Sequence, residues 1–227
     1  MDSRTRLWLT IFLGMMTAIA PLSTDMYLPA LPEAQADFGV STSLVQMTLT
    51  MTMLGMAVGQ IFLGPLSDMH GRRLPLFCGM VVFAAVSLGC CFSGSIEPFL
   101  VLRFLQGLAG ASGIVIARAI ARDVAEGVEL TRFLAILMLV NGLAPILAPV
   151  VGGQLLRLSS WHIIFAVLSA IGVIMALWTL GTRETLPKEQ RAAGMAQSFR
   201  TFPKLLNDRY FFGHCLLQCF VFAAFFS

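Results

Sequence analysis

Long runs without Asp, Glu, Lys or Arg divide this chain and constrain its fold more than any other feature. Seven such runs cover residues 7–24, 40–67, 74–96, 98–117, 133–156, 158–182 and 210–227, and only the fourth contains a charged residue, Arg103. About 20 apolar residues let a helix cross the hydrocarbon of a bilayer. The runs lack the alternation of a membrane-spanning strand, and backbone in lipid must bond within its own segment. The sequence therefore predicts an all-α integral membrane protein.

Composition excludes a soluble domain. Only 12% of the 227 residues are charged and 57% are hydrophobic, whereas soluble domains carry about 25% charged residues. The net charge is +3, and no Lys/Arg cluster is interleaved with aromatic residues, so nucleic acid is not an expected partner. The expected surroundings are the lipid bilayer.

The first run has an alternative interpretation as a cleaved signal peptide. Arg4 and Arg6 would be its basic start and residues 18–20 its cleavage site. Because Pro21 would follow the cut and further spans come after it, an uncut helix is the favoured reading.

The basic residues predict an orientation. Thirteen of the 15 Lys and Arg residues precede the first run or follow the second, fourth and sixth runs. Basic loops stay on the cytoplasmic side. The N-terminus and the loop after the sixth run are therefore expected in the cytoplasm, with the chain in a bacterial inner membrane.

The organisation expected is a six-helix bundle over residues 1–181, a cytoplasmic loop over 182–208, and the start of a seventh helix over 209–227. Within the loop, residues 198–208 have the pattern of a short amphipathic surface segment. The bundle suggests a three-plus-three inverted repeat, since the helices that open its two triplets each carry an embedded charge, Asp25 and Arg103. A second half would have to follow.

Glycine and cysteine positions point to packing. Gly55 and Gly59 form G-x-x-x-G in the second span, and Gly107, Gly110 and Gly113 give the fourth span a thin face. All five cysteines lie in apolar runs and no metal-ligand set accompanies them, so they are expected to pack as small apolar residues, with no metal site and no cofactor.

The segment "GPLSDMHGRR" joins the second and third spans. Gly64 and Gly71 permit close approach and a tight bend, and Asp68 can pair with Arg72 or Arg73. This charged turn is interpreted as a latch between neighbouring helices.

Four stretches together carry a family resemblance. "GPLSDMHGRR" resembles the signature loop of the major facilitator superfamily, and "RFLQGLAGASG" resembles a fourth-helix motif of its proton-linked members. "PLSTDMYLPALP" is similar to the end of the first helix in the Bcr/CflA branch of drug exporters. "GLAPILAPVVGG" resembles the fifth-helix motif of drug:proton antiporters, carried by Gly142, Pro145, Pro149, Gly152 and Gly153. It departs from that motif at residue 148, an alanine where many members have glycine.

The resemblance implies the first half of a twelve-helix transporter and assigns roles to its residues. Asp25 lies about 6 Å and Arg103 about 7.5 Å inside the same membrane side at 1.5 Å per residue. Asp25 is expected to bind the coupling proton, with Arg103 pairing with it at some stages. The alternative is that Asp25 only caps the helix or lies at the outer membrane interface. The family pattern also implies an ion pair between Arg72 and Asp123. The residues expected to line a substrate cavity are Gln106, Tyr27 and Met51.

The function expected is proton-coupled export of amphipathic drugs, with protons and small-molecule drugs as partners and the missing second half required for transport. The alternative is a truncated fragment that inserts in the membrane but does not transport. A six-helix membrane enzyme is disfavoured because no nucleotide-binding loop or catalytic constellation is present.

Overall fold

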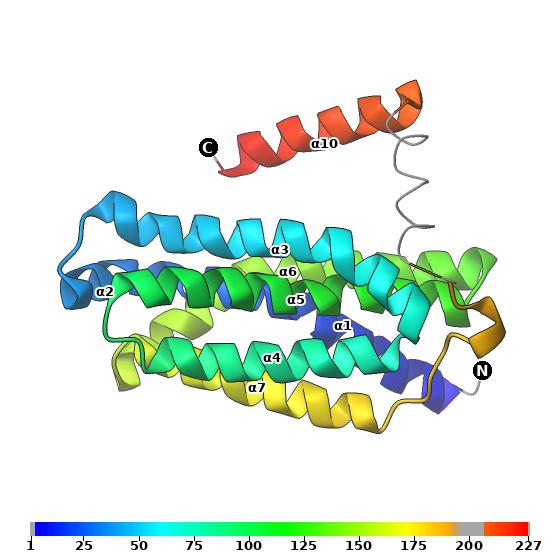
Figure 1. The fold of residues 1–227 in the computed structure, drawn as a ribbon, viewed down its shortest axis with the longest axis horizontal. Helices are drawn as coiled ribbons and strands as arrows, with labels where there is room; N and C mark the ends of the chain where they lie inside the picture. Colours follow the sequence, from blue (N-terminus) through cyan, green and yellow to red (C-terminus); the bar gives the residue numbers. More distant parts are fainter. Residues whose placement is uncertain (1–2, 193, 195–206, 227) are drawn as a thin grey trace.

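Long antiparallel helices make up most of the chain (Figure 1). The computed structural model describes residues 3–192, 194 and 207–226. Six helices are long and apolar enough to cross a membrane, counting only the described residues. These spans are formed by α1 (Ser3–Asp25) with η1 (Leu28–Ala30) and α2 (Leu31–Phe38), then α3 (Thr42–His70), α4 (Arg73–Cys91), α5 (Ile96–Val124), α6 (Gly127–Leu158) and α7 (His162–Leu180). The predicted all-α membrane fold is confirmed.

Several helices are longer than the apolar runs that predicted them. The fourth run ends at residue 117, but α5 continues to Val124 and so includes Arg118 and Arg122. Likewise α6 begins at Gly127, six residues before the fifth run. Apolarity marks only the part of a helix that contacts hydrocarbon, while the backbone ladder continues into more polar surroundings.

Close backbone contact joins α3 to α5. A Cβ atom at Gly55 would overlap the carbonyl of Phe104, and one at Gly107 would overlap the carbonyl of Thr52. Gly113 lies in the same way against Met16 of α1. The predicted packing role is confirmed for these glycines, but not for Gly110, whose Cβ would make only ordinary contacts.

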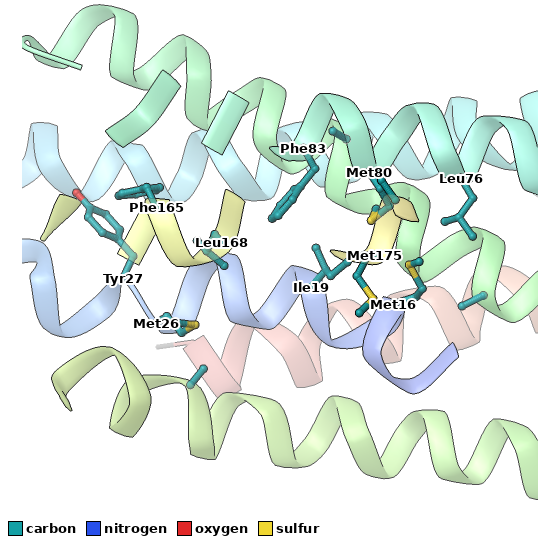
Figure 2. Packing of buried hydrophobic residues seen from close by; sticks show 14 of the residues in the cluster. Met16, Ile19, Met26, Tyr27, Leu76, Met80, Phe83, Phe165, Leu168 and Met175 are labelled. Atoms are coloured by element: carbon teal, nitrogen blue, oxygen red, sulfur yellow. The ribbon is translucent and has the colours of Figure 1, made fainter. Parts of the chain in front are cut away.

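The buried core runs along the centre of the bundle (Figure 2). At one end it contains Tyr27 and Phe165, and towards the other Met16, Met80 and Met175. We call the first the aromatic end, defined by the packed rings of Tyr27, Phe38, Phe99, Trp161 and Phe165. We call the opposite end of the bundle the basic end. It contains the start of α1, the α3–α4 turn and the last residues of α7.

The segment that follows α7 makes contacts that the sequence did not predict. Residues 182–208 were expected to form a loop between the halves, and of these, residues 184–192 dock on the α3–α4 turn. The Ala192 amide donates to the Asp68 carbonyl at 2.9 Å, and η2 (Lys188–Gln190) lies within the docked part. Residues 198–206, most of the expected amphipathic segment, lie outside the described part of the chain.

Helices α3 and α6 are the least buried of the six spans. In the most apolar stretch of each helix, 22% of α3 and 17% of α6 is buried inside the bundle. Helix α10 (Arg209–Phe226) lies apart from the bundle in Figure 1, and residues 207–221 are exposed.

Candidate functional site

Arg103 lies in the core at the aromatic end and is fully buried. Its Nη1 donates to the carbonyl of Ser23 on α1 at 2.9 Å and to Oε1 of Gln106 at 2.5 Å. The amide nitrogen of Gln106 in turn donates to Oγ of Ser87 on α4 at 2.8 Å. This chain of bonds, which we call the Arg103 network, ties α1, α5 and α4 together.

Aromatic rings supply the rest of the surroundings of the guanidinium. Its carbon lies 4.9 Å from the ring centroid of Tyr27 and 5.4 Å from that of Phe165. Cation–π contacts of this kind are strongest where water is excluded. Among the described residues, no acceptor bonds Nε or Nη2 of Arg103. A buried arginine with two unbonded donor nitrogens retains capacity to bind an anionic group.

Asp25 lies at the last residue of α1 and is half-buried. Its carboxylate accepts from the hydroxyl of Thr24 at 3.1 Å. None of the ion pairs found in the described part of the chain joins it to a cation.

The expected direct pairing of Asp25 with Arg103 is therefore absent from this conformation. The equal depth expected for the two charges does not by itself bring their side chains together. Arg103 faces Ser23 and Tyr27, which are four residues apart on one side of the α1 end. At about 100° per residue, Asp25 points about 200° away from Ser23.

The residues expected to line a substrate cavity differ in how deeply they are buried. Gln106 and Tyr27 are fully buried in the packed core, and Met51 on α3 is half-buried. The two surface cavities at the basic end are lined by other residues. In this conformation, Gln106 acts as the acceptor for a buried cation.

The turn between α3 and α4 forms the expected charge cluster. Nε of Arg72 lies 2.9 Å from Asp123 on α5, and its Nη1 lies 2.5 Å from Asp68 and 2.8 Å from Oγ of Ser67. The predicted Arg72–Asp123 ion pair is confirmed. Burial alone would lower the pKa of Arg72, but its bonds to Asp123 and Asp68 outweigh burial and raise the pKa above its usual value.

The glycines of this turn differ in importance. Gly71 ends α3 with φ of 88°, in the region that favours glycine, and a Cβ there would collide with Glu184 and Arg191. A Cβ at Gly64 would meet Val115 at 3.6 Å, an ordinary contact. The close approach expected at Gly64 is thus not required in this conformation.

Sequence reasoning missed Glu184, which belongs to the same cluster. Its carboxylate accepts from the backbone amides of Arg72 at 2.7 Å and Arg73 at 3.2 Å, and lies 3.8 Å from Arg191. Burial would raise the pKa of Glu184, but the amides of Arg72, Leu186 and Arg73 and the nearby Arg191 hold it below its usual value. Helix α4 has no acidic residue in its own first turn. That lack was the available signal, because a helix start is stabilised by a negative charge.

We call this cluster the latch: Asp68, Arg72, Asp123 and Glu184. Two further contacts strengthen its link to the end of α7. The side chain of Arg73 donates to the carbonyl of Leu180, and the hydroxyl of Thr185 donates to Asp123 at 3.1 Å. The latch therefore joins four segments: α3, the start of α4, the end of α5 and the residues after α7.

The fifth-span motif lies entirely inside α6, which includes both Pro145 and Pro149. Gly152 packs against α1, because a Cβ there would overlap the carbonyl of Met26. Gly142 and Gly153 face open space, with nothing near their Cβ positions. Gly152 is thus needed for packing within the bundle, whereas Gly142 and Gly153 lie at its surface without close neighbours.

Six apolar spans, a buried charge network and a charged turn between the second and third spans define a multi-span helical membrane protein. The sequence profile of the Major Facilitator Superfamily matches residues 13–227. The chain belongs to this superfamily, whose members are transporters and not enzymes.

Three relatives resemble this chain over most of its length. It is 43% identical to the "Uncharacterized MFS-type transporter YdgK" of Bacillus subtilis, over 96% of this chain and 55% of that protein. It is 38% identical to a bicyclomycin resistance protein homolog of Haemophilus influenzae, over 79% of this chain and 45% of the relative. It is 32% identical to the multidrug resistance protein MdtL of Salmonella heidelberg, over 82% and 48%. These relatives support the predicted Bcr/CflA branch, and the chain spans about half of their length.

A solved structure supports the fold. The proton:xylose symporter XylE superposes with a TM-score of 0.74 at 14% identity, over 88% of this chain and 52% of XylE. At that identity, the likeness concerns the fold alone.

Proposed function

We propose that this chain is the first half of a proton-coupled drug exporter in a bacterial inner membrane, with its basic end in the cytoplasm. The names of the bicyclomycin-resistance and multidrug-resistance relatives support drugs as the substrate class. The basic residues concentrated at one end support the orientation.

One observation carries the proton-coupled part of the proposal. Asp25 is a half-buried carboxylate in a span, and no cation pairs with it in the described structure. Ionisable residues within spans are costly, and they mark ion and proton pathways. Asp25 would take up a proton on one side of the membrane and release it on the other.

Arg103 has a complementary part in this mechanism. Its Nε and Nη2 lack acceptors within the described structure, while Asp25 lacks a cation. A rotation of the last turn of α1 that brings the two together would favour the charged carboxylate and expel its proton. The conformation described here would then be the separated stage of the cycle.

Energetics permit one proton to drive useful export. A charge moving through 100 mV supplies about 2.3 kcal/mol. This corresponds to a gradient of roughly 50-fold for a neutral drug per proton, at about 1.4 kcal/mol per tenfold.

Everted membrane vesicles test the proposal. With the second half of the transporter supplied, a proton gradient should drive uptake of a fluorescent drug that carries no net charge. Asp25→Asn should abolish it, whereas Glu97→Gln, an exposed carboxylate near the same membrane side, should not. Full gradient-driven uptake by Asp25→Asn would exclude Asp25 as the proton carrier. The 227-residue chain alone should insert without transporting, because half of the cavity wall is missing.

A further inference from the structure

A cavity of about 660 Å³ opens at the basic end, between the start of α1, the end of α5 and the residues after α7. Its volume is in the range of small-molecule sites. None of the latch residues and none of the Arg103 network lines it. The proton exchange proposed above involves Asp25 and Arg103, and neither lines this cavity.

The floor of the cavity is apolar and aromatic. It is formed by Trp8 and Phe12 of α1 with Ile120 and Val124 of α5. The ring of Trp8 stacks on Phe12 with centroids 5.8 Å apart and meets Trp178 of α7 edge-on at 5.7 Å. Positions 8 and 12 share one face of α1, and so does Arg4 at the rim.

The rim is positively charged. Arg4 and Arg183 line the cavity, and no acidic residue does. Neither arginine belongs to an ion pair in the described part of the chain, whereas nearby Arg6 pairs with Glu129 at 3.6 Å. Two free guanidinium groups above an apolar pocket suit a ligand with an anionic head and a hydrocarbon tail.

The cavity also adjoins surface that lipid would cover. On α1, Leu7 and Ile11 are 63% and 49% exposed, and on α7 Leu177 and Leu180 are 62% and 47% exposed. Each of these residues lies within four positions of a residue that lines the cavity, so an acyl chain on this surface would lie close to it.

We propose that this cavity binds an anionic phospholipid, with its phosphate held by Arg4 and Arg183 and part of an acyl chain against Trp8 and Phe12. Trp at the membrane interface and basic pockets at the ends of spans are general features of lipid binding. The site goes beyond the proposed transport function and needs only that the bundle lies in a membrane. The bound lipid would fasten the start of α1 to the end of α7.

Native mass spectrometry of the delipidated 227-residue chain in neutral detergent tests this site. Phosphatidylglycerol should bind more tightly than phosphatidylcholine, and its deacylated headgroup should not displace it. The double variant Arg4→Gln/Arg183→Gln should lower the affinity for phosphatidylglycerol about 30-fold, since each basic residue near an anionic headgroup contributes about fivefold. The control Arg132→Gln/Arg209→Gln removes the same charge from two exposed residues and should leave the affinity unchanged.

A second measurement uses the unmodified arginines, so it does not depend on how the double variant folds. Phosphatidylglycerol with brominated acyl chains should quench tryptophan fluorescence, and Trp8→Phe should remove most of this quenching. Equal binding of the two lipids, equal effects of the two double variants, or quenching that is insensitive to Trp8→Phe would each overturn the proposal.

Discussion

At the scale of single residues, burial changes the role that the sequence suggested for Arg103. This arginine within a span was expected to pair with Asp25. In the structure it is fully buried, bonded to a carbonyl and an amide, and covered by aromatic rings. Its neighbours therefore determine both the stability of the bundle and how readily Arg103 can change partners.

Gln106 and Ser87 allow this to be measured. Gln106→Met keeps the side-chain volume but removes an acceptor from a buried cation, and should cost about 1.5–3 kcal/mol. Ser87→Ala removes a bond between neutral groups and should cost about 0.5–1.5 kcal/mol. Thermal unfolding in detergent, followed by circular dichroism, should show the larger loss for Gln106→Met. Equal losses would mean that Arg103 does not depend on Gln106.

The sequence predicted which charged residues matter but not the directions in which their side chains point. Asp25, Arg103 and Arg72 were found because charges stand out in apolar sequence. Whether Asp25 and Arg103 touch depends on the rotation of α1 near its end, where Pro21 lies inside the helix and η1 begins three residues after Asp25. No periodicity in one sequence determines that rotation.

At the scale of elements, glycine contacts decide which helices approach most closely. The α3–α5 contact needs both Gly55 and Gly107, whereas Gly142 on α6 faces open space. The G-x-x-x-G spacing predicted a close contact correctly. It did not identify the partner helix, because the spacing describes only one of the two surfaces.

Two alanine substitutions should therefore act in opposite directions. Gly55→Ala should destabilise the chain by about 1–3 kcal/mol, because its methyl group meets the backbone of α5. Gly142→Ala should be neutral or stabilising by up to about 1 kcal/mol, since alanine favours helix. Melting temperatures in the same detergent test this, and a Gly55→Ala chain as stable as the unmodified one would contradict the packing described.

The latch should make stability depend on pH through Glu184. Its pKa is lower in the folded chain than its ordinary value of 4.5. Folded-state stabilisation by the ionised carboxylate is thus complete above about pH 4.5 and is lost as the pH falls through the lowered folded pKa.

Glu184→Gln should remove this dependence. The difference in melting temperature between the unmodified chain and Glu184→Gln should be largest at neutral pH and should shrink as the solution is acidified below pH 4.5. Glu189→Gln, an exposed residue of η2, serves as the matched control and should show no such trend. A constant difference at all pH values would exclude ionised Glu184 as the stabilising group.

At the scale of the whole molecule, the bundle presents two poorly buried helices, α3 and α6, on its flanks. Their exposed residues, and the open glycines of α6, offer surfaces for the second half that the relatives possess. The apolar runs predicted the six spans, because every helix that crosses the hydrocarbon needs about 20 apolar residues. They did not predict the docking of residues 184–192, because that docking depends on single carboxylate and amide contacts.

In the mechanism proposed above, Asp25 exchanges a proton for drug. The most direct test is proton release on drug binding, measured with a pH indicator in weakly buffered detergent solution after the two halves are assembled. Adding a transported drug should release protons from the unmodified transporter and none from Asp25→Asn, with drug binding by Glu97→Gln still releasing them. Undiminished proton release by Asp25→Asn would contradict the account.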